Sequence, residues 1–272
     1  MKNLKIIIIP VAAFILLLVL VALIVKNKGS RESGISASFA SELNSQADNL
    51  TKEGKLIEAQ EIYKKIVTDS PDFKDIAQVE KKLQDLNMLV LFSRLETPQT
   101  TLYEVKSGDS LAKIAKKFNT TAEFIKKSNG ISSDVIKAGE KLRIWSGKFS
   151  CVVDKSQNTL ILKSNDDVVK VYLVSTGADN HTPVGIYKII NKLVNPPWYK
   201  EGAAVPIPPE SPENILGTRW MGFDIPEYGI HGTTEPESIG KQATKGCVRM
   251  LNKDVEELYS ILPVGTEVTI ID

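Results

Sequence analysis

The chain has few of the residues that build disulfide scaffolds or metal sites. Its 272 residues include only two cysteines and two histidines. Two cysteines are too few for a disulfide-built scaffold, and no cysteine or histidine spacing typical of a zinc site occurs. The formal net charge of +1 lacks the basic excess that nucleic-acid-binding proteins carry. We therefore expect no metal, no cofactor and no nucleic-acid partner.

One long hydrophobic run is present, at residues 6–25, interrupted only by Pro10. Twenty helical residues span about 30 Å, the thickness of one hydrocarbon core. A cleaved signal peptide would be followed by small residues, whereas Lys26-Asn27-Lys28 follow here. The sequence thus predicts a cytoplasmic tail over 1–5, a single-pass anchor in the cytoplasmic membrane over 6–25 and a flexible linker over 26–37. Positive charges flank both ends, so charge does not decide the orientation.

Residues 38–95 have helical periodicity and resemble the second half of a tetratricopeptide repeat. Gly54 is placed to break a first helix and Pro71 to end a second. The apolar positions of the second helix share one face: Ala59, Ile62, Tyr63 and Ile66. Only one repeat is visible, and about three are needed for a stable stack. We expect a helical hairpin that acts as a spacer, with a protein-binding module as the alternative; the run 86–92 is apolar enough to need a cover.

A linker at 96–101 leads into a compact module at 102–146. A strand at Tyr103–Val105, a helix from Leu111, a second helix after the Thr120-x-x-Glu123 capping box and a strand at 141–145 are expected in that order. The pieces YxVxxGDSL, IAxxF, NGI and GEKLRI resemble a LysM domain. That resemblance implies a βααβ fold that binds glycan containing N-acetylglucosamine. The residues expected to line its groove are Gly108, Asp109, Ser110, Asn129, Gly130 and Ile131.

Residues 148–272 read as a mainly-β domain with one helix. Short alternating runs predict strands at 151–153, 159–162, 168–175 and 185–190. The proline-rich stretch 195–209 is unsuited to a central strand and reads as a long loop, a common form for a lid. Asn252 is expected to cap the helix, and a strand at 268–271 closes the domain.

A cysteine and a histidine in this domain lie 16 positions apart, at Cys247 and His231. A cysteine nucleophile needs a base, and imidazole is the side chain best poised for that proton. Gly232 leaves its carbonyl free to hold the ring N–H opposite the catalytic nitrogen. Gly246 lets backbone N–H groups approach a substrate carbonyl and form an oxyanion hole.

Positive and aromatic side chains surround this pair. Lys245 and Arg249 are expected to lower the thiol pKa, and Arg249 either binds a substrate carboxylate or orders the loop. The aromatics Tyr228, Trp220 and Trp198, together with Arg219, are candidates to shape a cleft, although aromatics are more often core. Away from the pair, Cys151 is expected to be a buried structural thiol, and His181 a surface residue.

The string from His231-Gly232 to Thr244-Lys245-Gly246-Cys247-Val248-Arg249 resembles the signature of the YkuD-like L,D-transpeptidase catalytic domain. Many members have histidine where this chain has Lys245, which leaves the upstream His231 as base. The resemblance implies a peptidoglycan transpeptidase in which Cys247 attacks the carbonyl before the terminal D-Ala of a stem peptide. The amine of a neighbouring stem's third residue then attacks the thioester and forms a 3→3 crosslink. The implied substrate-binding residues are Arg249, Lys245, Tyr228 and Trp220.

The whole chain is thus expected to be an α+β multidomain protein: a transmembrane helix, a helical hairpin, a βααβ LysM module and a mainly-β catalytic domain. Its expected partners are peptidoglycan stem peptides and glycan strands, with the catalytic part outside the cytoplasmic membrane. Because every candidate nucleophile lies after Lys148, the LysM module is expected to be separable from the chemistry. The same site used with water would make an L,D-carboxypeptidase or cell-wall cysteine peptidase, and a non-catalytic wall-binding scaffold is a further alternative. A sortase-like site fits less well, because its arginine lies farther from the cysteine.

Overall fold

The computed structural model describes residues 36–200 and 202–272. The predicted tail, the anchor at 6–25 and most of the linker lie outside the described residues. Within the described ranges, no helix is long and apolar enough to cross a membrane.

The first part of the fold is a layer of three helices, one more than the predicted hairpin. They are α2 (Ala37–Lys52), α3 (Leu56–Asp69) and α4 (Ile76–Leu91). Gly54 has a φ of +77°, a backbone conformation that favours glycine, and it separates α2 from α3 as predicted. Pro71 follows the end of α3, because proline cannot continue a helix. The three helices enclose a small hydrophobic core of their own around Tyr63 and Ile66.

Helix α4 also covers one edge of the large sheet in the domain at 148–272, at strand β5 (Asp167–Leu173). Gln84 accepts a hydrogen bond from the Val171 N–H at 3.0 Å, and Asn87 donates to the carbonyls of Val168 and Val169, each at 3.1 Å. These side chains satisfy backbone groups that an edge strand would otherwise expose. Of the apolar run 86–92, Met88, Leu91 and Phe92 pack on the core of this domain. Leu86 packs within the helical layer, and Leu89 is exposed. The helical layer therefore supports the edge of the sheet.

The next module has the predicted βααβ order: β1 (Thr100–Glu104), α5 (Leu111–Lys117), α6 (Ala122–Asn129) and β2 (Lys141–Trp145). Strands β1 and β2 pair antiparallel. Ser110 and Thr121 cap the two helices through their side chains. Gly130, with a left-handed φ of +63°, ends α6.

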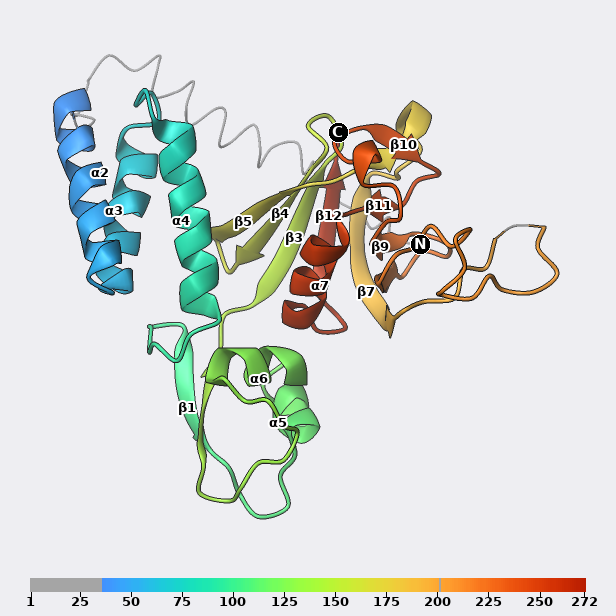
Figure 1. Ribbon diagram of the computed structural model, residues 1–272, viewed down its shortest axis with the longest axis horizontal. Helices are drawn as coiled ribbons and strands as arrows, with labels where there is room; N and C mark the ends of the chain where they lie inside the picture. Colours follow the sequence, from blue (N-terminus) through green and yellow to red (C-terminus); the bar gives the residue numbers. More distant parts are fainter. Residues whose placement is uncertain (1–35, 201) are drawn as a thin grey trace, which may run out of the picture.

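The catalytic domain is built on an eight-stranded sheet in the order β11-β9-β8-β7-β12-β3-β4-β5 (Figure 1). Its strands, besides β5, are β3 (Phe149–Asp154), β4 (Thr159–Ser164), β7 (Gly185–Val194), β8 (Arg219–Phe223), β9 (Gly229–His231), β11 (Val248–Arg249) and β12 (Glu267–Ile271). A two-stranded parallel sheet joins β6 (Thr176–Gly177) and β10 (Gln242–Thr244). Because β5 and β11 are opposite edges of the large sheet, the helical layer lies far along the sheet from β9 and β11.

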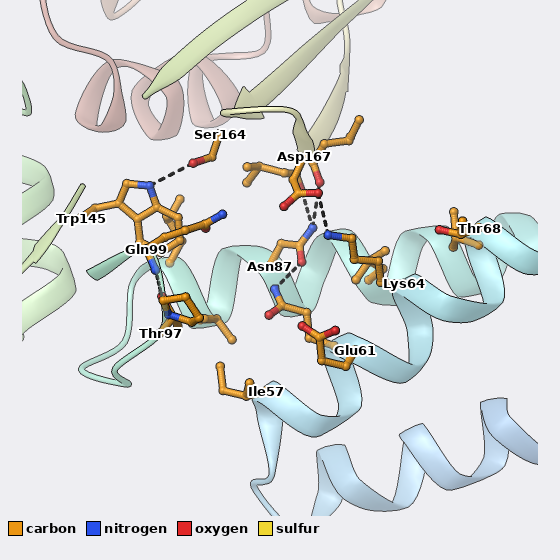
Figure 2. A pocket seen from close by; sticks show the side chains of 18 residues that line it. Ile57, Glu61, Lys64, Thr68, Asn87, Thr97, Gln99, Trp145, Ser164 and Asp167 are labelled. Carbon is orange, nitrogen blue, oxygen red and sulfur yellow. Dashed lines mark hydrogen bonds and ion pairs between the residues drawn. The ribbon is translucent and has the colours of Figure 1, made fainter. Parts of the chain in front are cut away.

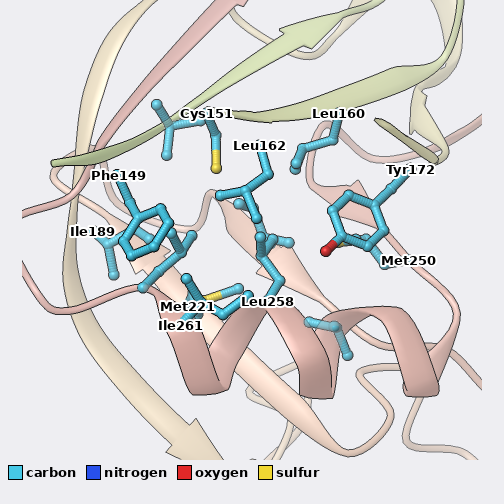
Figure 3. Packing of buried hydrophobic residues seen from close by; sticks show 14 of the residues in the cluster. Phe149, Cys151, Leu160, Leu162, Tyr172, Ile189, Met221, Met250, Leu258 and Ile261 are labelled. Atoms are coloured by element: carbon cyan, nitrogen blue, oxygen red, sulfur yellow. The ribbon is translucent and has the colours of Figure 1, made fainter. Parts of the chain in front are cut away.

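Helix α7 (Asn252–Ile261) packs its apolar face on this sheet. Figure 3 shows Leu258 and Ile261 of the helix facing Leu162 and Cys151 of the strands. Cys151 is 1% exposed, so the prediction of a buried thiol is confirmed. This core fixes the position of the strands that end at the candidate site.

The LysM-like module shares this core and is not merely tethered to it. The ring of Phe124 meets Phe92 and Phe149, with centroids 5.7 Å apart in both cases. The Thr121 hydroxyl donates to the Ser260 carbonyl near the end of α7. The buried Arg143 side chain donates hydrogen bonds to the carbonyls of Val90 and Leu91, the last two residues of α4. It also donates to the carbonyl of Leu95, which follows the helix. The module is therefore docked on the domain at 148–272, and the expectation that it performs no chemistry stays a prediction.

The predicted long loop lies between β7 and β8 and is held by hydrogen bonds between its own residues. Trp198 and Ile207 exchange backbone hydrogen bonds of 2.8 and 2.9 Å. The buried amide of Asn214 donates to the carbonyls of Pro196, Ile207 and Pro208. One side chain thus ties together both arms of the loop.

Candidate active site

The two candidate catalytic residues are brought together by a parallel strand pair. In the β9–β11 register, Val248 lies opposite Ile230 and Arg249 opposite His231. Cys247 directly precedes β11 and so lies level with the start of β9. The Met250 N–H donates to the His231 carbonyl at 2.9 Å, which closes the pair at its other end.

His231 is buried, with 3% of its surface exposed. Its Nδ1 lies 2.7 Å from the Gly232 carbonyl, the contact that the sequence predicted. The ring stacks on Trp220, with centroids 6.1 Å apart. Burial and, to a smaller extent, the Arg249 charge lower the pKa of His231 to about 4, although the hydrogen bond to the Gly232 carbonyl opposes the shift. The imidazole is therefore neutral at neutral pH, and a carbonyl at Nδ1 assigns the proton there and the lone pair to Nε2.

Cys247 is partly exposed, and its thiol donates to the Glu227 carbonyl at 3.3 Å. Burial raises the pKa of Cys247 to about 11, while a hydrogen bond from the Gly229 backbone and the Arg249 charge lower it by less. The prediction of a lowered thiol pKa is therefore wrong: the loss of solvation outweighs the nearby cation. Lys245 has an exposed side chain and does not contribute to this shift.

A neutral thiol and a neutral imidazole on paired segments of the sheet define what the site can do chemically. The proton must leave Sγ while the sulfur attacks, so His231 would act as a general base and not as the partner of a stable ion pair. The Cys247 thiol donates its hydrogen bond to the Glu227 carbonyl, so the thiol must rotate away from that carbonyl before its proton can pass to His231.

The backbone around Gly246 is tightly constrained. Gly246 has a φ of +131°, and a Cβ there would lie 2.5 Å from the ring of Tyr228. Its N–H donates to the Thr244 hydroxyl at 3.0 Å, and that hydroxyl donates to the Cys247 carbonyl at 2.7 Å. The Gly246 N–H is thus engaged, contrary to its predicted role as an oxyanion donor. The Cys247 N–H has no acceptor among the described residues.

Arg249 is 5% exposed and lies under the loop that follows β9. Its Nη1 contacts a Glu235 carboxylate oxygen at 2.7 Å and the Ser238 hydroxyl at 2.9 Å. Of the two predicted roles, the contacts favour ordering of the loop. A buried cation with a carboxylate partner also shapes the electrostatics of both His231 and Cys247.

Asn252 supports the site in a way that the sequence did not predict. It was expected to cap α7, but the cap position is Leu251 and no side chain fills it. Instead, the Asn252 amide oxygen accepts from the N–H groups of Thr218 and Thr233, and its nitrogen donates to the Thr233 carbonyl. A Cβ on Gly232 would lie 2.1 Å from that oxygen. No periodicity signals such a contact, because it joins segments distant in sequence.

Residues 148–270 match the L,D-transpeptidase catalytic domain family (YkuD), and residues 103–145 match the LysM domain. The chain is 35% identical over 175 residues to the putative L,D-transpeptidase YkuD of Bacillus subtilis, covering 62% of this chain and 97% of that protein. The chain belongs to the L,D-transpeptidase family. It is also 42% identical over 127 residues to the putative L,D-transpeptidase YqjB of the same organism, covering 44% of this chain and 70% of that one.

Solved structures of this family resemble part of the transpeptidase at lower similarity. L,D-transpeptidase 3 of Mycobacterium tuberculosis, in complex with a faropenem-derived adduct, has 16% identity and a TM-score of 0.40, covering 50% of this chain and 66% of that one. The catalytic domain of the E. faecium L,D-transpeptidase has 20% identity and a TM-score of 0.38, covering 46% and 98%. The assignment to the family rests on the sequence relatives.

The other predicted residues of the transpeptidase fall into two groups. Tyr228 is half-buried against Gly246 and Trp220 is half-buried against His231, so both border the site. The His181 side chain is exposed as predicted, but its carbonyl lies 3.2 Å from the position of a Cβ on Gly246. The backbone near His181 therefore belongs to the wall of the site.

The predicted glycan-binding residues largely serve the LysM fold itself. Asp109 accepts hydrogen bonds from the Tyr103 hydroxyl and the Lys106 N–H, and Ser110 caps α5. Asn129 is buried, and its amide pairs with the backbone of Arg143. Gly108 and Gly130 occupy left-handed turns, and Ile131 packs on the module's core. These predicted residues therefore have structural contacts within the module, and their role in glycan binding stays a prediction.

A cleft of about 320 Å³ lies away from the catalytic pair, between α3, α4, the linker before β1 and the β4–β5 turn (Figure 2). Its polar groups pair with one another: Gln60 with Asn87 at 2.6 Å, Lys64 with Asp167 at 2.6 Å and Trp145 with Ser164 at 3.1 Å. None of the predicted catalytic residues lines it. Within the described residues, no group of three His, Cys, Asp or Glu side chains is placed to hold a metal ion.

Proposed function

We propose that the transpeptidase crosslinks peptidoglycan stem peptides from third residue to third residue through a thioester on Cys247. The observation that supports this most directly is the hydrogen bond between Nδ1 of His231 and the Gly232 carbonyl, on a strand that pairs in parallel with the strand directly after Cys247. This arrangement offers a base with its lone pair on Nε2 and a thiol on a neighbouring segment.

In the first half-reaction, the Cys247 sulfur attacks the carbonyl between the third residue of a donor stem and its terminal D-Ala. The thiol proton passes to Nε2 of His231, and the Cys247 N–H stabilises the oxyanion. His231 then gives the proton to the departing D-Ala nitrogen. The C–N bond breaks and a thioester remains.

In the second half-reaction, the amine of a neighbouring stem's third residue attacks the thioester carbonyl. His231 accepts the amine proton, the C–S bond breaks, and the proton returns to the Cys247 sulfur. A new amide bond has then replaced the lost one, and no net oxidation or reduction has occurred. Water in place of the amine would give an L,D-carboxypeptidase with the same residues.

We place this reaction outside the cytoplasmic membrane, because peptidoglycan lies there. The LysM match supports glycan binding by residues 103–145, and its shared core would hold the glycan at a constant distance from Cys247. The anchor at 6–25 stays a proposal drawn from the sequence. The helical layer braces β5, which favours the spacer interpretation over a site for a protein partner.

The test is incubation of the full chain with purified tetrapeptide muropeptides, followed by separation of the products by mass. Crosslinked dimers are expected from the wild type and from Cys151→Ala, and none from Cys247→Ala. His231→Ala should slow turnover by roughly 10²–10⁴, the usual worth of a general base. Tripeptide monomers without dimers would identify a hydrolase, and dimers from Cys247→Ala would refute the mechanism.

A further inference from the structure

A buried lysine outside the catalytic pair lies at the base of the loop that packs on Gly246. Lys155 is 2% exposed, although lysine is almost never buried without a partner. Its ammonium group donates to the Thr182 carbonyl at 2.9 Å and lies 3.0 Å from a carboxylate oxygen of Asp272. The hydrogen bond from Lys155 is the largest cause that holds the pKa of Asp272 below its usual range, and Asn180 adds another.

The loop from Gly177 to Thr182 is closed by side chains and strained turns. The Gly177 N–H donates to the Thr182 hydroxyl at 2.7 Å. Asp179 and Asn180 adopt left-handed φ values of +49° and +63°, which these two residue types tolerate better than most. Lys155 is thus bonded to the residue that closes the loop.

The same loop contacts the nucleophile segment directly. A Cβ on Gly177 would lie 3.0 Å from the Cα of Gly246 and 2.6 Å from the Thr182 nitrogen. Because glycine has no side chain, the backbone segments at Gly177, Thr182 and Gly246 can approach one another this closely. In the β6–β10 pair, Gly177 lies opposite Thr244. The Thr244 hydroxyl bonds both the Gly246 N–H and the Cys247 carbonyl.

We propose that Lys155 is a positioning residue that sets the backbone of Gly246 and Cys247 for oxyanion stabilisation. The inference rests on the proposed role of Cys247. The contacts run in order from the Lys155 ammonium group to the Thr182 carbonyl, from the Thr182 hydroxyl to Gly177, and from Gly177 through Thr244 to the Cys247 backbone. Lys155 itself touches no reacting atom.

Two reagents that attack the same sulfur separate this role from a general loss of structure. A carbapenem is opened by attack on a carbonyl, so its reaction develops an oxyanion that needs the backbone donor. Iodoacetamide is attacked at a saturated carbon, and no oxyanion forms. Loss of donor alignment should therefore slow the first reaction much more than the second.

The experiment measures both rates by intact mass on the full chain, in a Cys151→Ala background. Lys155→Met and Thr182→Val should each slow carbapenem acylation by at least tenfold, a fraction of the 10²–10³ that a lost oxyanion donor costs. Alkylation of Cys247 should change by less than about threefold, because it needs no such donor. Lys188→Met removes an equally charged but exposed lysine of β7 and should leave both rates unchanged.

Equal slowing of both reactions, or no slowing of acylation in a folded variant, would refute the positioning role. If Lys155→Met does not fold, Asp272→Asn decides the matter, because that side chain is 69% exposed and its loss leaves the core intact. The same selective slowing, at smaller size, is expected there. An adduct that persists in Cys247→Ala would instead refute the proposed function.

Discussion

At the scale of single residues, the site is governed by burial more than by neighbouring charge. The pKa of Cys247 is raised to about 11 and the pKa of His231 is lowered to about 4, and both shifts favour the neutral side chain. The buried Arg249 opposes the shift at the thiol and adds to it at the imidazole. A protein that stores its nucleophile as a thiol limits side reactions until a substrate carbonyl is in place.

The alkylation rate of Cys247 should therefore rise steadily toward pH 11, with no plateau near neutrality. Iodoacetamide reacts with the thiolate, whose fraction grows about tenfold per pH unit below the pKa. The measurement is a pH series in a Cys151→Ala background. His231→Ala should leave the profile nearly unchanged, because a neutral imidazole does not stabilise the thiolate. A plateau that begins below pH 7 would instead indicate a thiolate–imidazolium pair.

The folding stability should report His231 in mildly acidic solution. The pKa falls from about 6.5 when unfolded to about 4 when folded, so the unfolded chain binds the extra proton between these values. Stability is complete above pH 6.5 and is lost as pH falls toward 4, by roughly 3 kcal/mol. Urea unfolding of the wild type and of His231→Gln at pH 7 and pH 4.5 measures this loss. A free-energy difference between the two proteins that is independent of pH would contradict it.

At the scale of elements, α7 links the LysM module to the segment around His231. Near its C-terminal end, the Ser260 carbonyl accepts a hydrogen bond from the Thr121 hydroxyl. Its first residue, Asn252, forms hydrogen bonds with the backbone of Thr233, in the segment after β9. Lys192 of β7 donates to the carbonyls of Tyr259 and Leu262 at the end of the same helix, and burial lowers the pKa of Lys192 to about 8. The helix is thus bonded at both ends to parts of the chain that position the site.

Substitution of Asn252 should impair both folding and acylation. Asn252→Ala removes three hydrogen bonds and leaves backbone groups of Thr218 and Thr233 without partners, which should destabilise the protein by about 2–4 kcal/mol. Acylation should also slow, because the Gly232 carbonyl that orients His231 loses its support. Urea unfolding and carbapenem adduct formation measure the two effects. Lys253→Ala, on the neighbouring exposed residue, should change stability by less than about 0.5 kcal/mol.

At the scale of the whole molecule, three modules are joined into one body by shared side chains. Phe124 of the LysM module lies in the core of the catalytic domain, and Met88 and Leu91 of α4 join it. Arg143 holds the end of α4 from the LysM side. The position of the LysM module relative to Cys247 is therefore set by packing, and it does not vary as it would across a flexible linker.

Phe124→Ala should weaken the catalytic domain although it lies in another module. Loss of a buried ring at this junction should lower the free energy of unfolding by about 3–5 kcal/mol. Alkylation of Cys151 should also become faster, because the burial of Cys151 depends on the same core. Phe118→Ala is the matched control, because Phe118 packs on the module's own core. It should leave Cys151 protected. Equal protection in both variants would show that the domains fold independently.

The sequence determined the features that depend on local spacing and on side-chain type. The βααβ order, the breaks at Gly54 and Pro71, the long loop and the contact between His231 and Gly232 are all present in the structure. These follow from helix and strand periodicity, from turn residues and from the geometry of adjacent peptides.

Only the tertiary structure decided the ionisation of the site and the docking of the modules. The pKa of Cys247 depends on how much water the fold removes, and a count of nearby cations gave the wrong direction. The roles of Asn252 and Lys155, and the place of Phe124 in a second module's core, each join residues 19 or more positions apart. Sequence spacing carries no signal of such contacts, because they exist only once the sheet has brought distant segments together.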